Sequence, residues 1–309
     1  MKKYIIKRLL MLIPIILGVV LIVFFIMSLT PGSPGQIILG SNAKPEAIAS
    51  LNHELGFDKP FIQRYLNYVL DAARGDFGES YFSGKPVFND IFFKFPTTFT
   101  IAFFSVFFAS VIGIPLGIFS AIRQYSAFDI AITIFALLMA SVPSFWFGLM
   151  MILVFSLQLG WLPSFGIGTV SHYVLPVACM ALPTAAGIMR LTRSTMLETI
   201  KSDYIRTARA KGAKESSIIW KHSLKNALLP VITVLGMSFA GLLGGSIFIE
   251  KVFSIPGLGG LMLSAIVTND VPVVMGCTIF LATLFCSIML VLDIIYSFID
   301  PRIKARFGK

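Results

Sequence analysis

The stretch KSDYIRTARAKGAKESSIIWKHSLKNAL, residues 201–228, is polar and lies between two apolar runs. It carries seven Lys or Arg residues against two acids, Asp203 and Glu215. Basic loops resist translocation across a membrane, so this density of positive charge beside apolar runs predicts a membrane protein with residues 201–228 on the cytoplasmic side. The same composition also suits a solvated basic loop that lies on anionic lipid.

The stretch is expected to form two short helices around a glycine. Ser202 and Asp203 can cap a first helix, and Gly212 can end it in a left-handed turn. A second, amphipathic helix should follow, because its apolar residues fall near helical spacing; they are Ile219, Trp220, Leu224, Ala227 and Leu228. Pro230 would then open the next apolar run.

The fragments RTARAKG (206–212) and HSLKNALLP (222–230) resemble the cytoplasmic coupling loop of ABC-importer permeases. The form is that of the B-type permease of the dipeptide, oligopeptide and nickel group, in which the loop sits in a groove of the ATPase subunit. The general signature is altered here, because Arg206, Thr207 and Ala208 stand where Glu, Ala and Ala are expected and Pro230 comes five residues late. The resemblance implies an ATPase docking surface without catalytic residues, formed by Tyr204, Arg206, Thr207, Ala208, Lys211, Gly212 and Ala213.

Three further fragments extend the resemblance from the first apolar run to the last residues; they are GDFGESYFSGKPV, FSIPGLGGL and IDPRIK. The resemblance implies the fold of a type I ABC-importer permease, an all-α membrane protein with six transmembrane helices and an extracytoplasmic segment after the first helix.

Composition supports a membrane protein independently of any motif. The 309 residues are 56% hydrophobic and only 13% charged, which excludes an ordinary soluble domain. A net charge of +10 would suggest nucleic-acid binding in a soluble protein. Here the charges flank apolar runs, so we interpret them as topology signals and expect no nucleic-acid partner.

Six apolar runs are long enough to cross a hydrocarbon core of about 30 Å. They cover residues 9–29, 97–122, 130–157, 173–191, 231–249 and 273–298. The first resembles a signal peptide, but it is too long and lacks a cleavage motif before Pro31. We therefore expect three parts: an N-terminal end with the first helix (1–29), an extracytoplasmic segment (30–96), and a five-helix permease core (97–309) with its coupling loop at 194–229.

Local features add expectations about individual segments. In the extracytoplasmic segment, residues 61–73 have one apolar face and should form a helix, and the segment should pack over the pore mouth. Pro115 should kink the second span, and VPSFWFG (142–148) either breaks the third span or anchors it. The spacing of Gly241 and Gly245 predicts close helix packing. Buried positions inside the apolar runs are expected for the three cysteines, Cys179, Cys277 and Cys286.

Isolated hydroxyls occur in the spans other than the fifth. Because polar groups facing lipid are costly, some should face a pore or a partner helix. Each can also bond its own helix backbone, which is a structural role. These candidates for the translocation path are Thr97, Thr98, Ser105, Ser141, Ser144 and Thr184.

The sequence offers no chemistry of its own. It contains no G-x-x-x-x-G-K-[ST], HExxH or GxSxG motif, so we expect no catalytic residue, no metal site and no bound cofactor. ATP and Mg²⁺ should be held by partner subunits. An ion-coupled carrier would need charges at mid-membrane, and the one clear candidate, Asp293, lies near the inner end, where it could meet Arg190 or Arg193 or help to pack the helix. The alternative of another class is a channel or small secondary carrier that works without ATP. It would need a filter-like loop or a series of buried charges, and the sequence shows neither.

Together these features predict a permease subunit that forms half of the path of an ATP-driven importer for dipeptides or oligopeptides. The resemblance implies a second, homologous permease subunit, two ATPase subunits and an extracytoplasmic binding protein. The chain should cross the cell membrane several times, in contact with lipid, with both termini cytoplasmic. Nickel or a chelate of nickel is the alternative substrate, although the only histidines, His53, His172 and His222, form no cluster of the donors that nickel prefers.

Overall fold

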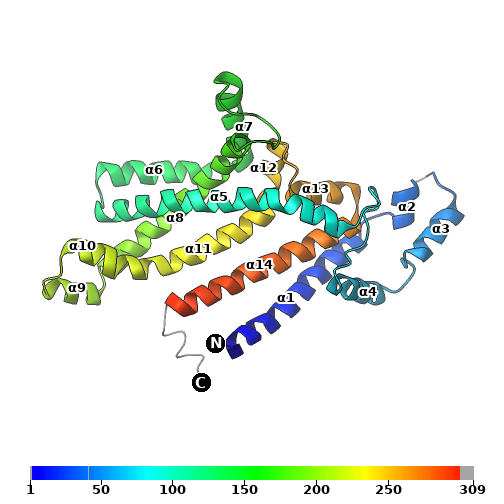
Figure 1. Ribbon diagram of the computed structural model, residues 1–309, viewed down its shortest axis with the longest axis horizontal. Helices are drawn as coiled ribbons and strands as arrows, with labels where there is room; N and C mark the ends of the chain where they lie inside the picture. Colours follow the sequence, from blue (N-terminus) through cyan, green and yellow to red (C-terminus); the bar gives the residue numbers. More distant parts are fainter. Residues whose placement is uncertain (1, 41, 300–309) are drawn as a thin grey trace. The chain divides into compact units, whose positions relative to one another are not determined.

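The computed structural model of the chain describes residues 2–40 and 42–299. Those residues form helices and connecting loops, with one isolated β-bridge between Glu79 and Pro86. The basic C-terminal residues 300–309 lie outside the described part. The helices pack into two units (Figure 1): among the described residues, unit 1 comprises Thr98–Ile255 and residues 288–299, and unit 2 comprises Lys2–Thr97 with Pro256–Ser287. These are packing units, so the domain boundaries drawn from membrane topology stay a prediction.

Unit 2 is built on an apolar helix and a shorter amphipathic one. Its helices are α1 (Lys2–Ser28), α2 (Pro34–Leu39), α3 (Pro45–Glu54), α4 (Phe61–Ala73), the first turns of α5 (Val87–Ile122), α13 (Leu258–Thr268) and most of α14 (Val271–Ile299). The predicted helix at 61–73 is confirmed as α4. Its apolar face packs on α1, where Phe61, Tyr65 and Val69 lie in one cluster with Phe24.

Unit 1 holds the rest of α5 and the remaining helices. They are α6 (Ala127–Ser141), α7 (Ser144–Met151), the π-helix η1 (Ile152–Gln158), α8 (Ser171–Ile200), α9 (Asp203–Ala210), α10 (Glu215–Ser217), the π-helix η2 (Ile218–Ser223), α11 (Leu224–Gly245), α12 (Ile247–Val252) and the end of α14. Close packing joins α5 to α8 at two glycines. A methyl group added to Gly113 would lie 2.7 Å from the carbonyl oxygen of Ala185, and one added to Gly117 would lie 2.6 Å from that of Met189.

The third predicted span is broken. Val142 has an extended backbone because the following residue, Pro143, disfavours the helical conformation before it. The helices on either side, Ala127–Ser141 and Ser144–Gln158, are bent by 103°. The described chain therefore has five helices long and apolar enough to cross a membrane, and six if the bent pair counts as one span.

The fifth span begins earlier than predicted. Instead of a separate amphipathic helix that stops before Pro230, residues 215–245 form one helix that continues through this proline. A membrane helix tolerates the lost N–H of a proline because local adjustments satisfy the freed backbone group. The helix ends at Gly245, and α12 follows as a separate turn instead of extending the span to Ile249.

Small residues pack at other positions than the sequence suggested. Within the described residues, no atom outside their own helix backbone lies within 4 Å of a methyl group placed on Gly241 or Gly245. Close approach occurs at Gly236, where an added methyl group would lie 2.2 Å from the side chain of Leu292 in α14. All three cysteines are free and buried, which confirms their predicted positions.

Candidate coupling surface and its support

The first helix of the polar stretch ends as predicted. α9 is followed by Gly212 with φ of +81°, a left-handed conformation that favours glycine. The N–H of Gly212 donates to the carbonyl of Arg209 (2.9 Å), and that of Ala213 donates to the carbonyl of Ala208 (3.2 Å). This pair of bonds is the Schellman motif, which satisfies the last carbonyls of a helix. Ser202 precedes α9 with extended backbone, but its hydroxyl donates to the carbonyl of Thr199 and does not cap the helix.

Side-chain contacts fix α9 against the returning chain. Arg209 donates to both carboxylate oxygens of Glu215, at 2.7 and 3.2 Å, across the Gly212 turn. The side-chain amide of Asn226 donates to the hydroxyl of Tyr204 at 2.7 Å. Beneath them, Ile205 and Ile218 are fully buried. The polar stretch is therefore an ordered helical hairpin and not a loose loop.

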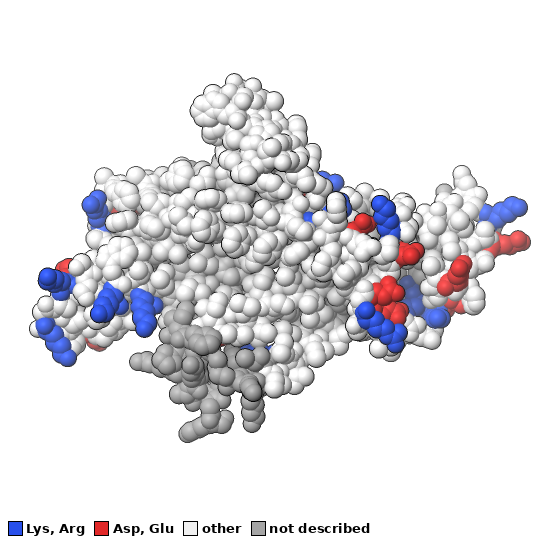
Figure 2. All heavy atoms as spheres, viewed as in Figure 1, with Lys and Arg blue, Asp and Glu red and all other residues white. Residues whose placement is uncertain are grey.

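The outer surface of this hairpin is basic. Of the residues expected to dock an ATPase, five are exposed and two are partly buried; the exposed ones are Tyr204, Arg206, Thr207, Lys211 and Gly212, and the others are Ala208 and Ala213. On the face drawn in Figure 2, blue side chains gather over the α9–α10 end of unit 1, while the sides of its long helices carry almost none. We call the outer surface of residues 203–214 the coupling surface.

An apolar cluster supports the coupling surface from below. Its buried members come from three helices: Ile118 and Ala121 in α5, Met196 in α8 and Ala227 in α11. Ile219 of η2 packs against the same cluster. Because the cluster joins the ends of α5, α8 and α11, and Ile219 of η2 packs on it, the hairpin that carries the coupling surface is anchored on helices long and apolar enough to cross a membrane.

A buried ion pair fastens the turn between α5 and α6 at this end of unit 1. Arg193 of α8 donates through Nε and Nη2 to the two carboxylate oxygens of Asp129, both at 2.7 Å. Asp129 also accepts from the Ser120 hydroxyl and from the backbone N–H of Tyr125 (2.9 Å). The Asp129 side chain is 4% exposed and that of Arg193 is 25% exposed. Of the two residues that the sequence offered as partners for Asp293, Arg190 and Arg193, the second is thus paired with Asp129.

A second buried carboxylate was missed because the sequence placed it in an outer loop. Glu250 lies in α12, is 1% exposed, and accepts hydrogen bonds from Thr98 (2.7 Å) and Ser246 (2.8 Å). The hydroxyl of Thr98 is therefore committed to Glu250. A signal existed in the chain, since Thr98 is the second residue of the second apolar run and Glu250 directly follows the fifth.

The other hydroxyls proposed for a path are dispersed. Ser105 donates to the carbonyl of Val177 on α8, whereas Thr184 and Ser141 donate to carbonyls of their own helices. Ser144 is exposed and Thr97 is partly buried. A cavity of about 810 Å³ between α5 and α8 is lined mostly by apolar side chains and by Thr100, and by none of these six candidates. Their role in a path stays a prediction.

Comparison with known proteins places this architecture in a family. Residues 113–305 match the family described as "Binding-protein-dependent transport system inner membrane component", and residues 1–102 match the N-terminal part of such membrane components. Similar curated proteins include the dipeptide transport system permease protein DppB of Alkalihalophilus pseudofirmus, which is 41% identical over 98% of this chain and 100% of the relative. The oligopeptide permease AppB of Bacillus subtilis is 39% identical over 98% and 100%, and the glutathione permease GsiC of Escherichia coli strain K12 is 38% identical over 98% and 99%.

Solved structures show the same fold. A chain of the MetNI methionine ABC transporter in an inward-facing conformation aligns with a TM-score of 0.54 and 24% identity, over 68% of this chain and 96% of that one. The family resemblance that rested on the polar stretch is confirmed. The protein is a multi-pass membrane protein and belongs to the family of inner membrane components of binding-protein-dependent transport systems.

Proposed function

We propose that this chain is the transmembrane permease subunit of an ATP-driven importer of dipeptides or oligopeptides, and that the coupling surface docks an ATPase subunit. The observation that carries the proposal is the ordered basic hairpin at Gly212, anchored on the ends of α5, α8 and α11. The names of the relatives support a peptide substrate, because they specify dipeptide, oligopeptide and glutathione transport.

The proposed assembly contains a second, homologous permease subunit, two ATPase subunits and an extracytoplasmic binding protein. ATP and Mg²⁺ belong to the ATPase subunits, so this chain hydrolyses nothing. The exposed bases of the coupling surface support a cytoplasmic location for it, with both chain termini on the same side.

The ATPase can change the conformation of the permease only through contacts that differ between two states. The coupling surface is suited to this, because the return half of its hairpin is the beginning of a membrane helix, residues 215–245. The Asp129–Arg193 pair links α6 to α8, so a displacement of α8 would carry the start of α6 with it.

A peptide substrate is proposed over nickel. Residues 2–40 and 42–299 contain no group of three or more His, Cys, Asp or Glu side chains that could hold a metal ion. Uptake of a labelled dipeptide and of labelled nickel, compared between a deletion strain and the same strain carrying this chain, separates the two substrates. Restored nickel uptake without restored dipeptide uptake would overturn the peptide assignment.

The docking role is tested at Gly212. No side chain or neighbouring segment among the described residues lies within 4 Å of a methyl group placed there, so a substitution acts through the backbone alone. A β-branched residue held at φ of +81° costs about 1–2 kcal/mol. Gly212→Val should therefore displace α9 relative to η2, whereas Gly212→Asn should be tolerated, because asparagine adopts the left-handed conformation readily.

The variants are compared for membrane level, co-purification of the ATPase subunits and peptide uptake. Gly212→Val is expected to reach the membrane at the normal level but to lose ATPase co-purification and uptake together, while Gly212→Asn keeps both. Arg206→Ala should have a milder effect, since a solvated charge contributes little. Normal uptake by Gly212→Val would mean that the stretch is only a basic hairpin on the lipid surface.

A further inference from the structure

Arg64 in α4 has a charge that no acid in unit 2 neutralises directly. Its guanidinium carbon lies 4.0 Å from the centre of the Phe57 ring and 5.6 Å from that of Phe24. Among residues 2–40 and 42–299, no acceptor forms a hydrogen bond or ion pair with this guanidinium. Burial lowers the pKa of Arg64, but an arginine side chain remains charged in proteins. The Arg64 cation is therefore held against aromatic rings, and its side-chain N–H groups donate no hydrogen bond within the described residues.

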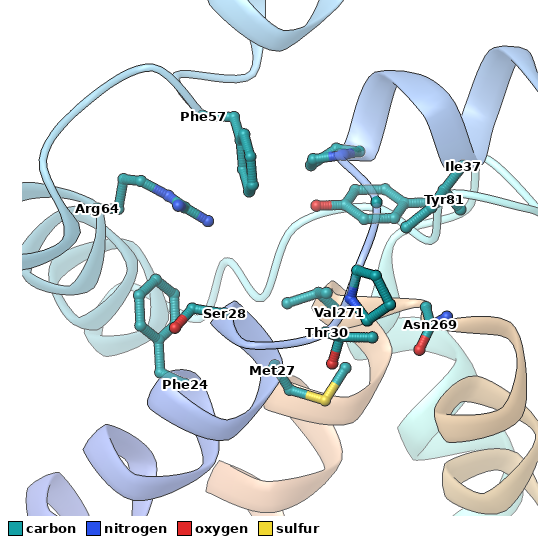
Figure 3. Close-up of a pocket in the computed structure, with 13 residues that line it drawn as sticks. Phe24, Met27, Ser28, Thr30, Ile37, Phe57, Arg64, Tyr81, Asn269 and Val271 are labelled. Carbon is teal, nitrogen blue, oxygen red and sulfur yellow. The ribbon is translucent and has the colours of Figure 1, made fainter. Parts of the chain in front are cut away.

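Those N–H groups face a cavity. Arg64 lines two cavities of about 220 and 30 Å³, and the two adjoin because they share six lining residues, including Arg64 and Tyr81. Figure 3 shows the guanidinium of Arg64 and the hydroxyl of Tyr81 pointing toward one another from opposite walls, with the Phe57 ring beside them. The open space lies between two hydrogen-bond donors.

A buried carboxylate fixes the backbone at Tyr81. Asp270, which is 4% exposed, accepts a hydrogen bond from the Ser80 hydroxyl at 2.6 Å and from the Tyr81 backbone N–H at 3.2 Å. Burial, together with the charge of Asp270, raises the pKa of Tyr81 to about 12. The phenol therefore keeps its proton at neutral pH and can donate it to a ligand.

The remaining lining groups also favour an anion. The larger cavity is lined by the bases Lys59 and Arg64 and by one acid, Asp71, which lies 3.8 Å from Arg74. The buried hydroxyl of Tyr68, a residue of the same lining, has no hydrogen-bond partner among the described residues. An unused cation, two phenol hydroxyls and aromatic walls together form a site for a planar anion that carries an apolar group.

We propose that this cavity binds the terminal carboxylate of a short peptide, with the edge of the Arg64 guanidinium donating to both carboxylate oxygens. Arginine recognises carboxylates in this two-pronged manner. The hydroxyl of Tyr81 is a further donor, and Phe57 packs against the last side chain of the peptide. A volume of about 220 Å³ is below the roughly 300–1,000 Å³ that encloses a drug-sized ligand, so the cavity holds one end of a peptide.

A lipid phosphate is the other anion that a guanidinium could take. The lining favours the peptide, because α1 contributes only Phe24, Met27 and Ser28 to it. Arg64 and Tyr68 come from α4, Lys59 from the residues before α4, Tyr81 from the loop before α5, and Asn269 from the residues before α14. The inference that the carboxylate belongs to a peptide rests on the proposed function. The inference that the cavity prefers a carboxylate rests on the cavity alone.

The test uses the full-length chain in nanodiscs of neutral phosphatidylcholine, with the dipeptide Ala-Phe as the free acid and as its C-terminal amide. Titration calorimetry should show the acid binding at least tenfold more tightly than the amide. Arg64→Gln should reduce binding of the acid to the level of the amide and leave the amide unchanged. Arg64→Lys keeps the charge but not the two-pronged geometry and should fall between them. Arg74→Gln is the matched control, because it removes the same charge from an exposed position at the end of α4, the C-cap residue, and it should keep the preference.

Equal affinity of the unaltered chain for the acid and the amide would overturn the proposal. This comparison needs no variant, so the proposal can be tested even if Arg64→Gln folds poorly. Retention of the preference by a folded Arg64→Gln would also overturn it. A third refuting result is competition by phosphatidylglycerol, with Arg64-dependent co-purification of that lipid, which would assign the cavity to a lipid headgroup. Loss of uptake in Gly212→Val cells has no bearing on this acid preference, so the importer proposal and the cavity proposal fail separately.

Discussion

Asp129→Asn should weaken the attachment of the α5–α6 turn to α8. The substitution removes the charge that accepts two hydrogen bonds from Arg193 at 2.7 Å and leaves the guanidinium beside a neutral amide. Breaking a buried ion pair by removing one partner costs about 3–5 kcal/mol. Arg193 is 25% exposed and regains some hydration, so we expect a loss of about 2–3 kcal/mol. At about 2–4 °C per kcal/mol, the midpoint of thermal unfolding should fall by about 4–12 °C.

The chain supplies its own reporter for this measurement. All three cysteines are buried, so a thiol-reactive dye fluoresces when the purified chain unfolds in detergent. The matched control is Asp203→Asn, because Asp203 lies 3.7 Å from Arg206 in an exposed pair of the same residue types. Such surface pairs contribute about 0–1 kcal/mol. The double variant Asp129→Asn/Arg193→Gln should lose less stability than the two single variants added together. Strict additivity, or equal midpoints for Asp129→Asn and Asp203→Asn, would refute a stabilising role for the Asp129–Arg193 ion pair.

Three other substitutions test the packing of unit 1 with the same dye. Gly117→Ala places a methyl group 2.6 Å from the Met189 carbonyl oxygen and should cost about 1–3 kcal/mol of stability. The control Gly241→Ala meets open space in the described chain and should be neutral. Equal unfolding midpoints for the two variants would contradict the α5–α8 contact. Thr98→Val removes a hydrogen-bond donor from the buried carboxylate of Glu250 and should cost about 1–3 kcal/mol of stability. The same substitution at the exposed residue Thr207 should not have this cost. An unchanged unfolding midpoint for Thr98→Val would show that the Thr98–Glu250 hydrogen bond contributes nothing to stability. Gly236→Ala overlaps the side chain of Leu292, so Leu292→Ala should restore part of the stability that Gly236→Ala loses; failure of this rescue would exclude the α11–α14 contact as the cause.

Features encoded by a few adjacent residues were predictable from the sequence. The amphipathic pattern located α4 at 61–73, and the glycine after a run of good helix formers located the left-handed turn at Gly212. Features that depend on distant residues were not. Asp129 and Arg193 are 64 positions apart, and the local sequence around either residue does not predict that it pairs with the other.

The sequence interpretation left the effect of Pro143 open and wrongly placed a helix boundary at Pro230. The local chemistry of proline is the same at Pro143 and Pro230, yet the chain bends by 103° at the first and continues through the second as one helix. Neighbouring helices decide whether a membrane helix tolerates the missing N–H, so a single sequence cannot distinguish the two cases. Glycine contacts likewise depend on which helix lies beside them. Gly113 and Gly117 pack against α8, whereas Gly241 and Gly245 contact no neighbouring helix in the described chain.

The uninterrupted helix from Glu215 to Gly245 has a mechanical consequence. At 1.5 Å per residue its 31 residues form a rod about 46 Å long, more than the thickness of a hydrocarbon core of about 30 Å. If a flexible joint lay between the coupling surface and the membrane, a small displacement of the coupling surface would not reach the span. A stiff helix instead converts that displacement into a tilt of the whole span. Near its start this helix contains the π-helical turn η2, Ile218–Ser223. The length of this segment should therefore tolerate insertion or deletion poorly, since one added residue rotates everything beyond it by about 100°.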